Sequence, residues 1–222
     1  MKYAWAFWGL IILALLVWSA FQSRFGFVVV NDQTDSTQDS SVESIQDQSE
    51  EKIADEAHLV LPVNQFFARI TKKPFGVYIT PETSPVQPEK FTGYHTGVDV
   101  EYADVEGNVE AWAVTAGKVV LARTASGYGG ILVIDHRPEF AWFSLYGHLY
   151  PASLIPVSTE VKAGDVVGVL AAAFSEGSGG ERKHLHFGII NQDKPNIAGY
   201  VQSEDELSGW LDPTEVLKTV SD

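Results

Sequence analysis

Short apolar runs separated by turn residues fill the chain from about Leu59 onward, and this pattern constrains the fold more than any other feature. The runs include KVVLAR at 118–123, ILVIDH at 131–136 and DVVGVLAAA at 165–173. Val, Ile and aromatic residues dominate them, and Gly, Pro and Asp separate them. Many short strands at this spacing indicate an all-β sheet or sandwich rather than βαβ units. The sequence predicts one helix in this part, at 213–218, where Asp212 can cap and Pro213 begins the first turn.

An uncharged segment near the N-terminus predicts a membrane anchor. Residues 3–23 contain no charged side chain, and about 20 apolar residues in a helix cross a hydrocarbon core of ~30 Å. Its tryptophans lie toward the two ends, where amphipathic rings favour the membrane interface. The alternative is a cleaved signal peptide, but that would usually have a shorter apolar region and small residues before the cleavage site. We expect one uncleaved transmembrane helix within residues 1–30.

Residues 31–57 predict an acidic flexible linker. They are rich in Ser, Asp, Gln and Glu and contain almost no large apolar side chains, so they cannot bury enough surface to offset the entropy lost on ordering. A flexible chain of about 26 residues has an end-to-end distance near 30 Å. We therefore expect the domain at 58–222 to work close to the membrane.

Charge and cysteine content exclude two classes of function. The net charge is −14, whereas a protein that binds nucleic acid needs clustered Lys and Arg for the phosphates, so we expect no nucleic-acid partner. The chain has no cysteine, which excludes disulfides and cysteine-ligated metals. Any bound metal must be held by carboxylates and by some of the six histidines.

The segment KHLHFGII places two histidines on one face of a predicted strand. His184 and His186 are two residues apart, so both side chains point the same way. Leu185 and Phe187 point the other way, toward what we expect to be the core. Alternating polar residues on any half-exposed strand would give the same pattern, so this pair alone leaves a metal site and an ordinary strand face equally open.

The segment GYHTGVDVEY contains a second possible chelate. His95 and Asp99 are four residues apart, and a straight strand would separate them by ~13 Å. They can hold one metal ion only if the chain bends, and Gly93 and Gly97 would permit a bend. Zinc sites in proteins use both His nitrogen and carboxylate oxygen as ligands. A surface turn with incidental charge is the alternative.

A third motif, SLYGHL, ends a predicted strand with His148. A single histidine near a strand end is more often structural than catalytic, so this motif carries weight only together with the other two. Four histidines fall in three short motifs in the order HxxxD, YxHL and HxH, and this combination is much more specific than any one part. His58 and His136 lie outside the motifs, and we expect them to be structural or exposed.

This combination resembles peptidase family M23, the LytM/lysostaphin-like zinc metallopeptidases, over roughly residues 75–217. The segments GYHTGVD, EAWAVTAGKVV, IDH, LYGHL, VKAGDVVGVL and HLHF carry the resemblance. It implies an all-β fold, an antiparallel sheet of the barrel-sandwich type, which here would follow the N-terminal transmembrane helix expected from residues 3–23. It also implies that a zinc ion (Zn²⁺) is bound by His95, Asp99 and His186. The catalytic residues that it implies are His148 and His184. Two histidines and an aspartate would also suit other transition metals.

The resemblance further implies a zinc-dependent endopeptidase that hydrolyses peptide bonds in bacterial peptidoglycan stem or cross-link peptides. That substrate lies outside the cytoplasmic membrane, so we expect a single-pass protein of the cell membrane with its catalytic domain on the extracytoplasmic side. The alternative is a catalytically silent or gated M23 domain that regulates another cell-wall hydrolase as a protein partner. The proline-containing segment 76–92 could cover its cleft. Family members that only activate other hydrolases typically have damaged ligand sets, whereas all five positions are present here.

Two carrier families share part of the pattern but not its chemistry. The runs TAGKVV and VKAGDVVGVL also resemble the biotinyl/lipoyl carrier hairpin, yet no lysine lies between Leu170 and Lys183, where a carrier needs one to modify. The sugar-phosphotransferase carrier domain has a similar β architecture but no use for an HxxxD chelate. The Gly-rich segment 175–181 lacks the GK[ST] ending of a phosphate-binding loop, and we expect it to lie at the rim of the cleft.

Overall fold

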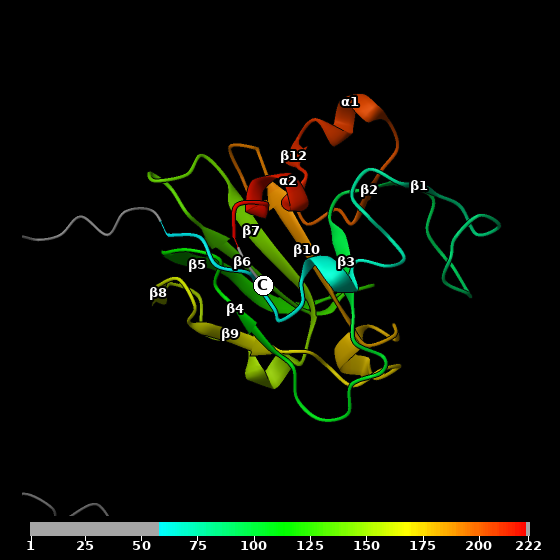
Figure 1. The fold of residues 1–222 in the computed structure, drawn as a ribbon, viewed down its shortest axis with the longest axis horizontal. Coiled ribbons are helices and arrows are strands. Elements are labelled where there is room, and N and C mark those ends of the chain that lie inside the picture. Colours follow the sequence, from blue (N-terminus) through cyan, green and yellow to red (C-terminus); the bar gives the residue numbers. More distant parts are fainter. Residues whose placement is uncertain (1–57, 221–222) are drawn as a thin grey trace, which may run out of the picture. The chain divides into compact units, whose positions relative to one another are not determined.

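A computed structural model of the chain describes residues 58–220 (Figure 1). The predicted anchor within residues 1–30 and the predicted linker at 31–57 lie outside the described residues. Among residues 58–220, no helix combines the length and the apolar character that a membrane span requires.

Strands dominate the described part of the chain. They are β1 Tyr78–Ile79, β2 Gly93–His95, β3 Val98–Glu101, β4 Glu110–Trp112, β5 Gly117–Ala125, β6 Gly129–Asp135, β7 Phe143–Leu149, β8 Glu160–Val161, β9 Val166–Val169, β10 His184–Ile190, β11 Tyr200–Val201 and β12 Trp210–Leu211. The helices are α1 Glu204–Leu207 and α2 Pro213–Leu217, with 3₁₀ turns at Phe67–Arg69, Pro151–Ser153 and Glu176–Ser178.

The main sheet has seven strands, in the order β12-β10-β7-β6-β5-β8, with β3 also paired to β10. Two smaller sheets have the orders β1-β2-β11 and β4-β9. Neighbouring strands in all three sheets are antiparallel. The structure therefore confirms the mainly β, antiparallel fold that the short apolar runs predict (Figure 1).

The central strands of the main sheet are buried on both faces. In β6, Ile131 and Val133 belong to one hydrophobic cluster, whereas Leu132 and Ile134 belong to another. Successive side chains of a strand point to opposite faces, so the two clusters lie on opposite sides of the sheet. Burial on both sides explains why β6 is apolar at almost every position rather than only at alternate ones.

Both helices begin with a side-chain cap, although the sequence analysis predicted only the second. In α2, the backbone N–H of Thr214 donates to Asp212 Oδ1 at 2.8 Å, and Pro213 occupies the first turn as predicted. In α1, the backbone N–H of Glu206 donates to Ser203 Oγ at 3.2 Å. The spacing of Ser203 and Glu206 is that of a capping box, so the sequence did contain a signal for this short helix.

Candidate metal and hydrolytic site

Strand β10 presents the HxH pair on the face opposite its core residues. Leu185 and Phe187 have no exposed surface and lie in the larger hydrophobic cluster, as predicted. His184 and His186 point the other way, and both are buried. The pair therefore lies at the floor of a site rather than on a solvated strand face, which removes the half-exposed strand as an explanation for the pattern.

The chain bends between β2 and β3, as the glycines suggested. Strand β2 ends at His95, Thr96 and Gly97 form the connection, and β3 pairs with β10 so that Asp99 lies opposite His186. A Cβ atom at Gly97 would collide with the carbonyl oxygen of Phe187 and lie 3.0 Å from His186 Nε2. Only glycine permits this close approach, and the bend brings His95 and Asp99 to the same point.

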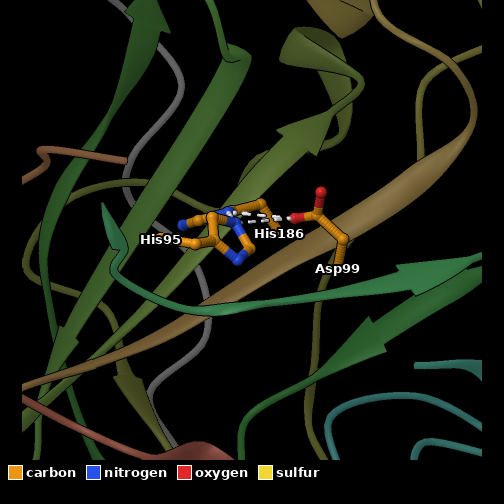
Figure 2. Close-up of side chains that lie close together, drawn as sticks. All are labelled: His95, Asp99 and His186. Atoms are coloured by element: carbon orange, nitrogen blue, oxygen red, sulfur yellow. Dashed lines mark hydrogen bonds and ion pairs between the residues drawn. The ribbon is translucent and has the colours of Figure 1, made fainter. Parts of the chain in front are cut away.

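The three predicted ligands converge there (Figure 2). His95 Nε2 lies 3.1 Å from His186 Nδ1 and 3.2 Å from Asp99 Oδ1, and His186 Nδ1 lies 3.1 Å from Asp99 Oδ1. Ligand atoms bound at ~2.0–2.2 Å to a tetrahedral zinc ion are about 3.3–3.5 Å apart. Two imidazole nitrogens and one carboxylate oxygen in this arrangement fit a metal ion of that size.

Neighbouring groups select the donor atom that each ligand offers. The Nδ1–H of His95 donates to the carbonyl oxygen of Pro74 at 3.1 Å, which leaves the lone pair of Nε2 facing the other two ligands. Arg182 Nη2 donates to Asp99 Oδ2 at 2.8 Å, so Oδ1 is the oxygen that faces His95 and His186. Hydrogen bonds of this kind orient metal ligands and fix the histidine tautomer.

Arg182 is a further residue of the candidate site, and it lies outside the three sequence motifs. Its guanidinium is buried. Besides the bond from Nη2 to Asp99, both Nε and Nη2 donate hydrogen bonds to the carboxylate of Glu101, at 2.6–3.0 Å. Glu101 lies opposite His184 in the pairing of β3 with β10. The arginine lies only two residues before His184, but its two partners are more than 80 residues away, and no local pattern links them.

Asp99 is ionised despite its burial. Desolvation alone would raise the pKa of its carboxyl, but electrostatic interactions with His184 and His95 and hydrogen bonds with His186 and His95 hold this pKa well below its usual range. For an imidazole, burial disfavours the charged, protonated form. Burial therefore lowers the pKa of His186. An anionic oxygen and neutral imidazoles are the protonation states that bind a metal cation.

The two predicted catalytic histidines lie side by side next to these ligands. The ring centroids of His148 and His184 are 4.2 Å apart, and His184 Nε2 is 3.5 Å from Asp99 Oδ2. The Nδ1–H of His148 donates to the carbonyl oxygen of Ser178, and that of His184 donates to the carbonyl oxygen of Arg182, each at 2.9 Å. Each ring therefore keeps its Nε2 as a free acceptor.

Both catalytic candidates are neutral at pH 7. Burial lowers the pKa of His148 to about 4 and that of His184 well below its usual range, since desolvation penalises the imidazolium form. A neutral imidazole with Nδ1–H bound to a carbonyl can accept a proton at Nε2. These two rings have the form that a general base needs before reaction.

His148 has a strained backbone. Its φ of 62° lies in the left-handed region, which costs a non-glycine residue about 1–3 kcal/mol. Its N–H donates to the carbonyl oxygen of Tyr128, and its carbonyl oxygen accepts from the N–H of Ala171. The neighbouring chain segments thus hold this turn at the end of β7, and the strain coincides with a residue that borders the ligand cluster.

A cavity of about 330 Å³ opens over the five residues. One wall is formed by Lys73 and Tyr200, and Lys73 Nζ lies 2.5 Å from Glu89 Oε2 and 2.9 Å from the Tyr200 hydroxyl. The ring of Phe91 stacks on that of Tyr200, with centroids 5.4 Å apart. Glu89 and Phe91 both belong to the segment 76–92, so this part of the chain does border the cleft.

The remaining histidines lie outside the site, as expected. His58 is exposed. His136 is buried beneath the sheet, where its Nδ1–H donates to the carbonyl oxygen of Ala116 and its Nε2 accepts from Ser144 Oγ, each at 2.7 Å. Both ring nitrogens are satisfied by protein groups, so His136 is structural.

The sequence from the β2 strand to the segment before β11 matches a known family model. Residues 93–197 match the model of peptidase family M23, and this span contains all five predicted site residues. Residues 93–197 form a peptidase family M23 domain. The family that the HxxxD, YxHL and HxH motifs predicted is thereby confirmed.

Several solved structures resemble the M23 domain. The catalytic domain of lysostaphin from Staphylococcus simulans is 22% identical, with a TM-score of 0.47, and the match covers 71% of this chain and 98% of that one. The structure of LytU is 26% identical, with a TM-score of 0.48 and coverage of 69% and 87%. Csd3 from Helicobacter pylori is 23% identical, with a TM-score of 0.43 and coverage of 74% and 44%. No curated protein matches the chain.

Proposed function

We propose that this M23-domain protein is a zinc-dependent endopeptidase that hydrolyses peptide bonds in peptidoglycan stem or cross-link peptides. The observation that carries the proposal is the convergence of three donor atoms, His95 Nε2, Asp99 Oδ1 and His186 Nδ1, which lie 3.1–3.2 Å from one another at the floor of an open cavity. Two neutral histidines border the same point. Ligands, acid/base groups and space for a peptide thus occur together.

His95, Asp99 and His186 would hold the zinc ion. When bound, zinc supplies Lewis-acid chemistry, since it lowers the pKa of a water molecule and polarises a carbonyl group. Arg182 keeps Asp99 Oδ2 engaged, so that the carboxylate presents a single oxygen. The donor set lacks cysteine and contains two imidazoles, which suits zinc but also other transition metals.

His148 and His184 would move the protons of the reaction. A neutral Nε2 accepts a proton from the attacking water and later returns it to the nitrogen of the leaving amine, so one histidine can act first as base and then as acid. The Nδ1–H bonds to the carbonyl oxygens of Ser178 and Arg182 hold both rings in place. Once protonated, the imidazolium also stabilises negative charge on the carbonyl oxygen under attack.

The predicted location of the protein follows from its proposed substrate. Peptidoglycan lies outside the cytoplasmic membrane, so the domain at 58–222 would be on the extracytoplasmic side, anchored by a helix within residues 1–30 and tethered by the linker at 31–57. The net charge of −14 gives no reason to expect binding to nucleic acid. A regulatory protein partner remains the counter-proposal if the cleft is gated.

A peptidoglycan digest tests this function. The full chain, loaded with zinc, is incubated with intact sacculi, and the released fragments are identified by mass. We expect defined peptide cleavage by the parent protein and by His58→Ala, in which an exposed histidine outside the site is changed, and no cleavage by His184→Ala. Zinc retention without cleavage by the parent would contradict the endopeptidase and favour the regulatory alternative.

A further inference from the structure

Glu181 lines the cavity over the candidate site, and its carboxylate has no partner there. It ends the Gly-rich segment 175–181 and lies three residues before His184, where β10 begins. Its backbone is held in place, since its carbonyl oxygen accepts a hydrogen bond from the N–H of Phe174 at 2.7 Å. The side chain is half-buried, and no group within residues 58–220 forms a hydrogen bond or an ion pair with its carboxylate.

The other Lys, Arg, Asp and Glu side chains that line this cavity are already paired. Lys73 Nζ lies 2.5 Å from Glu89 Oε2, and Arg182 Nη2 lies 2.8 Å from Asp99 Oδ2. Among the lining residues that the structure describes, each of these cations therefore has a carboxylate in contact with it. Glu181 adds a negative charge to the wall that neither cation neutralises by contact.

The carboxyl group of Glu181 is partly desolvated and lies within the field of the charges around the cavity. Burial raises the pKa of this carboxyl, and the positive charges of Lys73, Arg182 and Lys90 act against that rise. Lys90 belongs to the segment 76–92, which borders the cleft, but its exposed ammonium forms no ion pair with Glu181. A carboxylate that loses part of its water and gains no partner is destabilising. A cationic group of a ligand in the cavity would offset that loss.

A single unpaired carboxylate suits an ammonium group better than a metal ion. Within residues 58–220, the one cluster of side chains that could hold a metal is His95, Asp99 and His186, and it does not include Glu181. Zinc needs four ligands and calcium six or more, and Glu181 offers one carboxylate. An ammonium group needs one acceptor to form a charge-assisted hydrogen bond, which is about twice as strong as a neutral one.

We propose that Glu181 is a specificity-determining residue whose carboxylate binds an ammonium group of the substrate peptide. This inference rests on the proposed endopeptidase function. Glu181 lies three residues from His184 and next to Arg182, which holds Asp99, so an ammonium bound there is close to the scissile bond. The domain therefore prefers peptides with a free amino group near the bond that it cleaves over peptides in which this group is acylated.

The test uses pairs of cross-link peptides that differ in one amino group, which is free in one peptide and acetylated in the other. One pair carries this group on each side of the scissile bond. With the zinc-loaded full chain, we expect kcat/KM to be about 10- to 100-fold higher for the free amine in one pair, the usual effect of one hydrogen bond between charged groups. Glu181→Gln should reduce this preference to about threefold or less by raising KM for the free amine. Its urea midpoint and zinc retention should equal those of the parent, because no existing contact is removed.

Two further variants complete the test. Glu176→Gln is the matched control, since Glu176 is an exposed carboxylate of the same Gly-rich segment and does not line the cavity, and it should keep the full preference. Glu181→Lys should invert the preference, because an ammonium at this position repels that of the substrate. The inference is overturned if the parent cleaves both members of every pair equally fast, or if Glu181→Gln keeps the preference.

A general role of Glu181 in structure or turnover would also overturn the inference. It would appear as loss of zinc in Glu181→Gln, or as equally slower cleavage of the free and the acetylated peptide. Equilibrium binding of the same pairs separates this inference from the proposed function. A parent that cleaves no peptide but binds the free amine more tightly, in a manner lost in Glu181→Gln, would refute the endopeptidase and support the ammonium contact. No cleavage and equal binding would refute both.

Discussion

Replacing Arg182 with methionine removes the one guanidinium that two buried carboxylates share. Arg182 Nη2 lies 2.8 Å from Asp99 Oδ2 and 2.6 Å from Glu101 Oε1. The three side chains are 7%, 3% and 10% exposed, respectively, so water can replace little of the lost interaction. Methionine has a similar length and is apolar, and it would leave both carboxylates next to an apolar side chain.

The expected loss of stability is about 3 kcal/mol in the metal-free protein. Removing one partner of a buried ion pair typically costs about 3–5 kcal/mol, because a charge remains buried without compensation. The low end applies here because Lys72 Nζ remains 3.5 Å from Glu101 Oε2 and the imidazoles of the site remain around Asp99. In saturating zinc the loss should be smaller, since the cation would neutralise Asp99.

Urea unfolding of the metal-free protein measures the effect. With a slope of about 2 kcal/mol per molar urea, a loss of about 3 kcal/mol lowers the midpoint by roughly 1.5 M. Arg123→Met is the matched control, since Arg123 is exposed and donates only to the carbonyl oxygen of Thr124, and it should change stability by less than about 0.5 kcal/mol. Competition with a chelator should show zinc affinity about 10- to 100-fold weaker in Arg182→Met.

Two results would refute this reasoning. A loss of stability under about 1 kcal/mol would mean that Arg182 stabilises the buried carboxylates no better than a surface pair does. Unchanged zinc affinity would mean that the orientation of Asp99 does not depend on Arg182. Arg182→Lys separates the effect of charge from that of geometry. A single ammonium keeps the positive charge but cannot make the paired bonds to Glu101 and the bond to Asp99 together. This variant should therefore recover only part of the stability and zinc affinity that Arg182→Met loses.

Three further predictions concern the histidines and Asp99. Asp99→Ala should abolish zinc retention and peptide cleavage together, as judged by metal analysis after dialysis and by the peptidoglycan digest. His184→Ala should retain zinc but lose turnover, because its imidazole serves proton transfer and not metal binding. His136 contributes to the pH dependence of stability. Burial lowers its pKa to about 4, so between that value and ~6.5 the unfolded chain binds more protons than the folded one. Its contribution, about 3 kcal/mol for a shift of this size, is complete above pH ~6.5 and is lost as the pH falls toward 4, and His136→Gln should flatten the fall in urea midpoint.

Each of these predictions has a contrary outcome. Full activity in a zinc-free Asp99→Ala protein would remove the zinc assignment. Release of zinc by His184→Ala would mean that the roles of His184 and His186 are exchanged. An equally steep pH dependence in His136→Gln would show that other groups cause the acid instability.

The fold class and part of the site could be predicted because they depend on local sequence. The alternation in β10 placed Leu185 and Phe187 in the core and the two histidines on the opposite face, since side-chain direction in a strand follows residue parity. Gly93 and Gly97 indicated a bend for the same local reason. The cap of α2 was equally local, and so is the signal for α1, which is the spacing of Ser203 and Glu206.

The pairing of remote segments could not be predicted. Arg182 and Asp99 are 83 residues apart, and their contact depends on the register of β3 against β10, which single-sequence patterns do not specify. The same holds for Tyr128, whose ring packs against those of His148 and His186 from other strands. Neither residue belongs to the motifs that identify the five site residues.

The sequence by itself determined which side chains are the candidates for metal binding and proton transfer and which face of β10 the HxH pair occupies, because these follow from residue type and from a two-residue period. Only the tertiary structure decided which atoms they offer. The choice of Nε2 in His95 follows from the bond that its Nδ1–H donates to the carbonyl oxygen of Pro74, and the choice of Oδ1 in Asp99 follows from the bond that Arg182 donates to Oδ2. Those partners are brought together by strand pairing and burial, and their energies depend on distances that no local pattern encodes.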